Sequence, residues 1–295
     1  MRKAKLAWAT LTPLFLPTHV GVAAGIYQKH NIDLELSYTN NGPATMAALT
    51  GGDVQFAELA DPSVTTSALQ GLGVEWIAVS VPKPNLVLWA KPNINSMQDL
   101  KGKKIGVTTL GSVTGLFALA AIKQAGLEPQ KDISVIAAGG PAEQRAALAA
   151  GAIDAAVGDP DGPYEGVKIL VDLRQGFAFP QAGIAITKAF AQKDPQLVQD
   201  FTTAFVESVR RYKADPDLDV KVDMQYLKNN EAAAKKEIDG AIKVMDDNVA
   251  PTDKLIQQVL DMIADTNPKA KTANPKDFYD DKFAKVAAEQ AAKNP

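Results

Sequence analysis

The segment AALTGGDVQFA at residues 47–57 recurs as AALAAGAIDAA at residues 146–156. The two copies agree at five positions, Ala, Ala, Leu, Gly and Ala, with one constant offset of 99 residues. Each copy is typical of a helix end, a terminating glycine and a short apolar strand that runs into an Asp-Pro pair. One alternative is that helix–glycine–strand junctions look alike in unrelated places. Because the order of elements around the copies also agrees, we interpret them as parts of two similar α/β lobes.

Short β-rich runs alternate with helical stretches around these copies, over roughly the first 175 residues. This alternation is typical of βαβ units with mostly parallel sheets. The predicted strands lie at residues 5–10, 32–38, 54–59, 76–81, 104–109, 133–138, 153–158 and 168–173.

The pattern changes to helices alone after about residue 185. Asp194-Pro195 predicts a capped helix start, and an apolar stripe follows at Leu197, Phe201, Phe205 and Val209. Further helices are expected at 218–229, 231–246, 252–265 and 277–293. With GIAIT at 183–187 as a return strand, the chain is expected to cross between lobes twice. Lobe 1 is then 1–88 plus 184–295, and lobe 2 is 89–183.

The composition excludes several classes of function. The net charge is −3, and the only basic cluster is Lys101, Lys103 and Lys104, so we expect no nucleic-acid partner. The absence of cysteine excludes thiolate, disulfide and iron–sulfur chemistry, and two histidines are too few for most metal sites. No apolar run approaches the roughly 18 residues of a membrane span. We expect neither a cofactor nor a metal.

The stretch GVTTLGSVTG at residues 106–115 begins as a nucleotide-binding P-loop would. Ser112 and Val113 occupy the positions where a P-loop has Lys and then Ser or Thr, so ATP binding is not expected. Backbone N–H groups at the following helix start, the hydroxyls of Ser112 and Thr114, and a close approach at Gly111 would suit an anion or a carbonyl oxygen. The alternative is that Ser112 only caps its own helix.

Ligands of open α/β sheets bind beyond the carboxyl ends of the strands, so the loops there hold further candidates. Asp61 and Asp159 either face a ligand or cap a helix, and His19 is either a ligand contact or a half-buried helix residue. Lys83, Arg145 and Arg174 are the basic groups nearest these loops, and we expect them to be solvated rather than to contact a ligand. Possible stacking surfaces, or core aromatics, are Trp8, Phe15, Tyr38, Phe177 and Phe179. No catalytic constellation is found.

Three segments carry a resemblance to a known family. These are GIYQKHNIDL at 25–34, the AL-x-x-G-x-[VI]-x-[FA]-A strand entry, and DLKGKKIGV at 99–107. Over about residues 5–190 the chain resembles the solute-binding proteins of bacterial ABC transporters, in the branch for sulfonates, taurine, nitrate and thiamine-precursor pyrimidines.

The resemblance implies an α/β, two-lobed type II periplasmic-binding-protein fold with two hinge strands and a helical C-terminal region. It further implies a monomer that closes on a small polar organic solute, such as an organic acid, a sulfonate or a pyrimidine, for delivery to a membrane permease. The implied location is periplasmic or extracytoplasmic, with a leader removed and Met1 added. The implied ligand contacts are Thr10, Leu11, Thr12, Asn41, Gly42, Asp61, Ser80, Leu110, Gly111, Ser112, Val113, Thr114, Gly140 and Asp159.

One departure from the family pattern and two alternatives bear on this interpretation. These loops contain no clear arginine, which argues against a strongly anionic ligand such as nitrate, while Asp61, Asp159 and Asp161 would suit a ligand with N–H donors. One alternative is an enzyme on the same fold, of the menaquinone-pathway type, with a carboxylate or His19 as acid or base. The pyrimidine-synthase type needs cysteines that this chain lacks. The other alternative is an orphan sensor that presents its closed form to a receptor.

Overall fold

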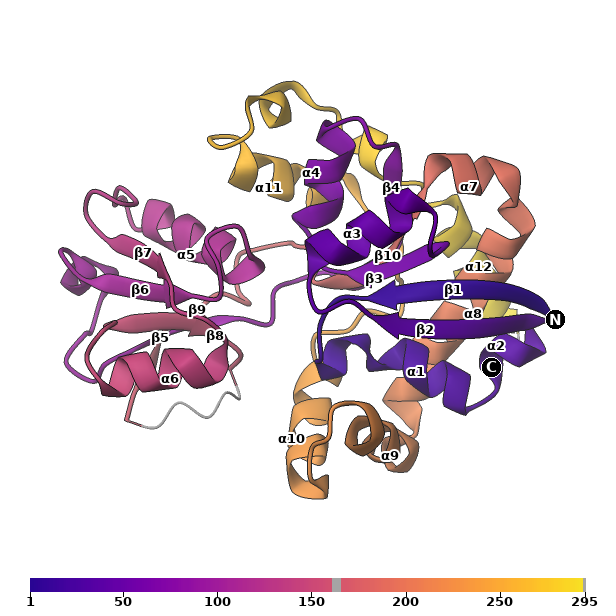
Figure 1. The fold of residues 1–295 in the computed structure, drawn as a ribbon, viewed down its shortest axis with the longest axis horizontal. Coiled ribbons are helices and arrows are strands. Elements are labelled where there is room, and N and C mark those ends of the chain that lie inside the picture. Colours follow the sequence, from indigo (N-terminus) through magenta and orange to yellow (C-terminus); the bar gives the residue numbers. More distant parts are fainter. Residues whose placement is uncertain (161–165, 294–295) are drawn as a thin grey trace. The chain divides into compact units, whose positions relative to one another are not determined.

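The computed structural model describes residues 1–160 and 166–293, and it divides into two compact units (Figure 1). Unit 1 consists of Met1–Lys83 and Ala178–Pro295, and unit 2 consists of Pro84–Phe177. The boundaries predicted from the sequence, after residues 88 and 183, lie a few residues further along the chain.

Unit 1 contains a five-stranded sheet in the order β2-β1-β3-β10-β4. Its parallel strands β1, β2 and β3 pair with one another, and β10 runs antiparallel between β3 and β4. The strands span Arg2–Trp8 (β1), Ile32–Tyr38 (β2), Phe56–Leu59 (β3), Val74–Val81 (β4) and Ala182–Thr187 (β10).

Helices pack on this sheet, and all the elements that follow β10 in the chain are helical (Figure 1). The helices of the first segment are η1 Pro13–Phe15, α1 Leu16–Ala23, α2 Ile26–Lys29, α3 Gly42–Gly51 and α4 Ser63–Leu69. The second segment has α7 Lys188–Lys193, α8 Pro195–Ala214, α9 Pro216–Tyr226, α10 Glu231–Ile242, α11 Asp253–Ile263, η3 Pro268–Thr272, η4 Pro275–Phe278 and α12 Lys282–Lys293.

Unit 2 contains a second five-stranded sheet in the order β7-β6-β8-β5-β9. Its strands are β5 Val87–Ala90, β6 Lys104–Val107, β7 Ser134–Ala137, β8 Ala155–Gly158 and β9 Lys168–Asp172. The helices η2 Met97–Leu100, α5 Val113–Gln124 and α6 Pro141–Ala149 accompany it. One cluster of its core forms around the buried side chains of Val87, Trp89, Leu148, Ile153 and Ala156.

The two sheets have the same topology. In each, three parallel strands stand in the order second, first, third, followed by an antiparallel strand and an outer strand. The antiparallel strand is β10 in unit 1 and β5 in unit 2, and each is the first strand that the chain forms on crossing into its unit. The prediction of two similar α/β lobes is therefore confirmed, although β5 was not among the predicted strands.

The repeated segment occupies equivalent places in the two sheets. Its first copy runs from α3 into β3, and its second copy runs from α6 into β8. The matched glycines, Gly52 and Gly151, have φ angles of +84° and +75°. Glycine reaches this left-handed region without steric cost, so it can terminate both helices.

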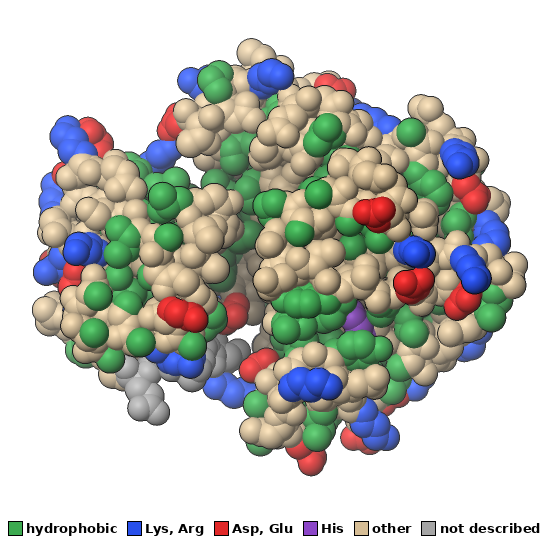
Figure 2. Space-filling view, in the orientation of Figure 1, with side chains coloured by type: hydrophobic (Ala, Val, Ile, Leu, Met, Phe, Trp, Pro, Cys, Tyr) green, Lys and Arg blue, Asp and Glu red, His purple; other side chains and the backbone are tan. Residues whose placement is uncertain are grey.

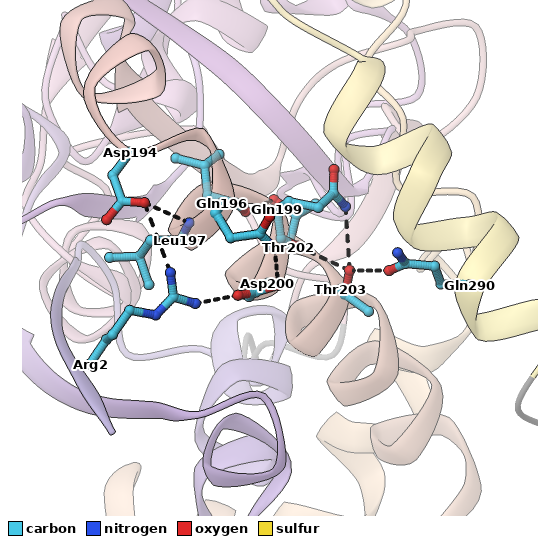
Figure 3. A network of polar contacts seen from close by, with 10 residues as sticks. Arg2, Asp194, Gln196, Leu197, Gln199, Asp200, Thr202, Thr203 and Gln290 are labelled. Atoms are coloured by element: carbon cyan, nitrogen blue, oxygen red, sulfur yellow. Dashed lines mark hydrogen bonds and ion pairs between the residues drawn. The ribbon is translucent and has the colours of Figure 1, made fainter.

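The helical tail is attached to the N-terminal strand by both packing and polar contacts. The predicted stripe of α8, which includes Leu197, Phe201 and Val209, is buried. Arg2 at the start of β1 forms ion pairs with Asp194 and Asp200 (Figure 3). The hydroxyl of Thr203 on α8 donates to Gln290 Oε1 of α12 at 2.8 Å. Residues far apart in the sequence are thereby held in one unit.

Candidate functional site

The predicted ligand contacts of each unit gather along the carboxyl edge of its parallel strands. In unit 1, the ends of three strands are joined because Thr39 N–H donates to Trp8 O and Ala9 N–H donates to Glu58 O, both at 3.1 Å. In unit 2, Ala138 N–H donates to Val107 O at 2.8 Å and joins the ends of β6 and β7. Loops that are separate in the sequence are therefore neighbours within each unit.

At the unit 1 edge, side chains that precede the helices cap their N-termini. Asn41 Oδ1 accepts from Ala44 N–H at 2.8 Å and caps α3. A Cβ atom on Gly42 would lie 2.3 Å from Ser63 Oγ, so the close approach of α3 and α4 requires glycine there. Thr12 caps η1, whereas Thr10 and Leu11 are exposed.

His19 is completely buried inside unit 1. Its Nδ1 donates to Phe15 O at 3.2 Å, and its ring lies 4.4 Å, edge to face, from the rings of both Trp8 and Tyr226. Burial lowers the pKa of the His19 imidazole to about 4, so the ring is neutral near pH 7. The sequence left open whether His19 contacts a ligand or is a half-buried helix residue, and in the structure its side chain is fully buried in an aromatic cluster.

Asp61 is also fully buried, and its carboxylate is occupied within unit 1. Oδ1 accepts from Thr65 N–H and Oδ2 accepts from the indole N–H of Trp76, both at 2.9 Å. Burial raises the pKa of Asp61 to about 6, although both hydrogen bonds oppose that rise. Ser80, whose hydroxyl donates to Ala182 O at 3.3 Å, and Phe179 are likewise inaccessible.

The loop from Thr108 to Thr114 in unit 2 forms a network of hydroxyl groups. Ser112 Oγ accepts from Gly115 N–H at 3.3 Å, which caps α5, and donates to Thr109 O at 2.7 Å. Thr114 Oγ1 accepts from Thr108 N–H at 2.9 Å and lies 2.9 Å from Ser112 Oγ. Ser112 is thus a cap, and it also fixes the shape of the loop.

Only one of the two glycines at this loop, Gly115, is required by close packing. A Cβ atom on Gly115 would lie 2.4 Å from Leu110 O, whereas one on Gly111 would meet nothing within 4 Å. Leu110 and Gly111 are exposed, and Val113 is half-buried. The open side of the loop is therefore at Leu110 and Gly111.

Gly140 and Asp159 complete the unit 2 edge. Gly140 is the residue before α6, with φ −73° and ψ −176°, and it has no side chain to cap the helix. Asp159 is exposed, and its carbonyl oxygen accepts from the indole N–H of Trp89 at 3.1 Å. Asp161 lies outside the described residues.

Basic groups are scarce at both edges. Arg174 forms a bidentate pair with Asp172, with both N–O distances at 2.8 Å. The segments 9–15, 39–41, 60–62, 108–112 and 138–140, which follow the parallel strands, contain neither Lys nor Arg.

Residues 1–160 and 166–293 contain no group of three or more His, Cys, Asp or Glu side chains arranged to hold a metal ion. In the same part of the chain, no helix combines the length and the apolar character needed to cross a membrane.

Sequence reasoning missed two members of these edges. Thr108 directly follows β6, and its place at a strand end was the sequence signal that could have identified it as a member of the loop network. Tyr226, which contacts His19, comes from the far end of α9, and no sequence pattern connects it with residue 19.

Comparisons with known proteins identify the family to which the chain belongs. A family model described as NMT1/THI5 like matches residues 12–218. The riboflavin-binding protein RibY of Chloroflexus aurantiacus is 27% identical over 223 residues, covering 72% of this chain and 63% of the relative. The taurine-binding periplasmic protein of Escherichia coli is 30% identical over 196 residues, covering 62% and 58%. The chain thus spans less than two thirds of the length of either relative.

A solved structure extends the likeness to nearly the whole chain. The periplasmic aliphatic sulphonate binding protein SsuA of Escherichia coli superposes with a TM-score of 0.79 at 18% identity, covering 94% of this chain and 96% of that one. At this identity, the likeness shows the fold alone.

Proposed function

The chain belongs to the NMT1/THI5-like family and has the fold of periplasmic binding proteins, and on this basis we propose that it is the solute-binding protein of an ABC importer. Its ligand is a small polar organic molecule, such as an organic acid, a sulfonate or a pyrimidine-like compound.

One observation carries this proposal. Two units of the same sheet topology each present a polar, loop-lined edge beyond the carboxyl ends of their parallel strands. In the proposed mechanism, the solute is held between the units, which act as the two lobes, and hinge closure buries it. The closed monomer then docks on a membrane permease outside the cytoplasm.

The accessible residues at the two edges are the proposed ligand contacts. They are Thr10, Leu11, Thr12, Asn41 and Gly42 in unit 1, and Leu110–Thr114, Gly140 and Asp159 in unit 2. His19, Asp61, Ser80 and Phe179 are fully buried, and in this proposal they position those contacts. Because the loops lack Lys and Arg, binding relies on hydroxyls, amides and backbone N–H groups.

The buried positions of the titratable groups support binding over catalysis. An enzyme of the alternative type needs an acid or base that reaches its substrate. His19 and Asp61 are inaccessible, and the hydrogen bonds of Asp61 are already formed within the fold. We therefore propose that the chain is not an enzyme.

Isothermal titration calorimetry against sulfonates, carboxylates, aminopyrimidines and riboflavin tests the proposal. We expect saturable binding of one compound class at a single site, and mass spectrometry is expected to recover that compound unchanged. Catalytic turnover of the bound compound would refute the proposal in favour of an enzyme.

A further inference from the structure

Four aromatic rings meet where β1 and β2 of unit 1 end. Trp8 and Tyr38 are the last residues of these strands and stand opposite each other in register. Their ring centroids are 5.0 Å apart, and His19 lies 4.4 Å from both Trp8 and Tyr226. The cluster thus joins two strands, α1 and α9 at the edge that holds the proposed ligand contacts.

Only part of this cluster is covered by protein. Trp8 is 4% exposed and His19 is 0% exposed, whereas Tyr38 is 43% exposed. The hydroxyl of Tyr38 donates to Asn40 Oδ1 at 2.9 Å, which restrains rotation of the ring. The result is an oriented ring with an open side and an aromatic support behind it.

The loop that follows β1 at the same edge of unit 1 carries an exposed apolar side chain. Leu11, in the loop after β1, is 49% exposed. Leu110, which is 55% exposed, occupies the corresponding loop after β6 of unit 2, and the pair Thr-Leu at 10–11 recurs at 109–110 with the same 99-residue offset. Figure 2 shows hydrophobic side chains at the surface over the end of β1 and the start of α1. Each unit therefore has an exposed leucine in the loop after its first parallel strand, β1 in unit 1 and β6 in unit 2.

The cluster carries no charge near neutral pH. Its histidine is neutral, because burial lowers the pKa of His19 to about 4. The loops that follow β1 and β2, at residues 9–15 and 39–41, contain neither Lys nor Arg, and Lys228 lies in the loop after Tyr226. The loops after β1 and β2, beside Trp8 and Tyr38, therefore offer a small anion no ionic partner. A planar ring can stack on a tyrosine and make apolar contact with a leucine.

We propose that the open face of Tyr38, supported by Trp8, His19 and Tyr226, stacks a planar aromatic ring of the solute. This inference rests on the proposed function and narrows its ligand to ring-bearing compounds. Leu11 contributes an apolar contact, and the hydroxyl and amide groups of the unit 1 edge bind the polar substituents.

Matched pairs of probes that differ only in the ring test the inference. They are benzenesulfonate with ethanesulfonate, benzoate with propionate, and benzamide with propionamide, together with riboflavin and tetramethylammonium. Calorimetry is run on the wild type, Tyr38→Leu, Tyr38→Phe and the control Leu72→Ala, which alters a leucine of unit 1 that is 48% exposed. Thermal melts of each variant establish that it is folded.

We expect a ring-bearing probe to bind more tightly than its aliphatic partner. Tyr38→Leu should weaken its binding roughly 5- to 150-fold, the range for losing one aromatic stack. Tyr38→Phe should retain more affinity than Tyr38→Leu, and Leu72→Ala should leave it unchanged.

Three results would overturn the inference. If an aliphatic probe bound as tightly as its ring-bearing partner and Tyr38→Leu changed neither affinity, Tyr38 would have no stacking role, although the protein would still bind a solute. Preferential binding of tetramethylammonium would identify the rings as a cation site. Failure of every probe to bind the folded wild type would refute the proposed function together with the inference.

Discussion

Buried carboxyl groups at single positions set the titration behaviour of unit 1. Asp61 accepts two hydrogen bonds, and its pKa is raised to about 6. Asp219 on α9 is fully buried, and neither carboxylate oxygen has a hydrogen-bond partner among the described residues. Burial, reinforced by the charge of Asp215, raises the pKa of Asp219 to about 8. The two hydrogen-bond donors at Asp61 thus limit the rise of its pKa. The pKa of Asp219, which has no such donors among the described residues, rises further.

The Asp219→Asn variant is expected to become more stable than the wild type at alkaline pH. The ordinary pKa of this carboxyl is 3.8 and the folded value is about 8, so the stability contributed by its proton is lost as pH rises through that interval. Asparagine removes the charge, and we expect a gain of about 1–3 kcal/mol above pH 8 that disappears near pH 4. Urea denaturation across pH measures it.

The neighbouring exposed carboxylate provides the control. Asp217→Asn alters the same helix without removing a buried charge, so its effect should not change over this pH range. An equal pH dependence in both variants would contradict the assignment to Asp219.

Helix starts are the elements that shape both edges. Asn41 begins α3 and Ser112 begins α5, each by accepting a backbone N–H of its own helix. Ser112 also joins the hydroxyl network with Thr109 and Thr114, so one side chain sets both the helix start and the loop. If this loop binds a ligand as proposed, hydrogen bonds that fix its shape beforehand reduce the entropic cost of binding.

Replacing Ser112 by alanine is expected to reduce both stability and ligand affinity. Loss of a cap typically costs about 0.5–2 kcal/mol, and loss of the hydroxyl network should loosen the loop. The control Asn230→Ala removes a cap of α10, where Asn230 Oδ1 accepts from Ala233 N–H at 3.0 Å, and should cost similar stability without changing affinity. Denaturation and calorimetry separate the two effects. Unchanged affinity in Ser112→Ala would show that Ser112 is a cap alone.

At the scale of the whole molecule, unit 2 is one continuous segment within a discontinuous unit 1. It has its own five-stranded sheet and its own buried core. A fragment of residues 84–177 is therefore expected to fold by itself, being within the roughly 50–250 residues typical of domains. Circular dichroism and a cooperative thermal transition test this. A fragment without a cooperative transition would show that unit 2 depends on unit 1.

The sequence alone was sufficient to predict much of the fold. The repeat at residues 47–57 and 146–156 predicted two equivalent lobes, because helix ends, glycine turns and strand entries are local patterns. The helix beginning at Asp194-Pro195 and its buried stripe were also predictable from spacing. The candidate residues at the strand ends followed from the general rule that ligands bind there.

What each candidate side chain faces was decided by the tertiary structure. His19 and Asp61 were open alternatives in the sequence, and both are buried because α1, α9 and the strand carrying Trp76 pack over them. Tyr226 reaches the aromatic cluster from α9, far along the chain. The sequence by itself determined the elements and their duplication, since these depend on local periodicity. Accessibility and hydrogen-bond partners depend on contacts between distant segments, which only the folded chain brings together.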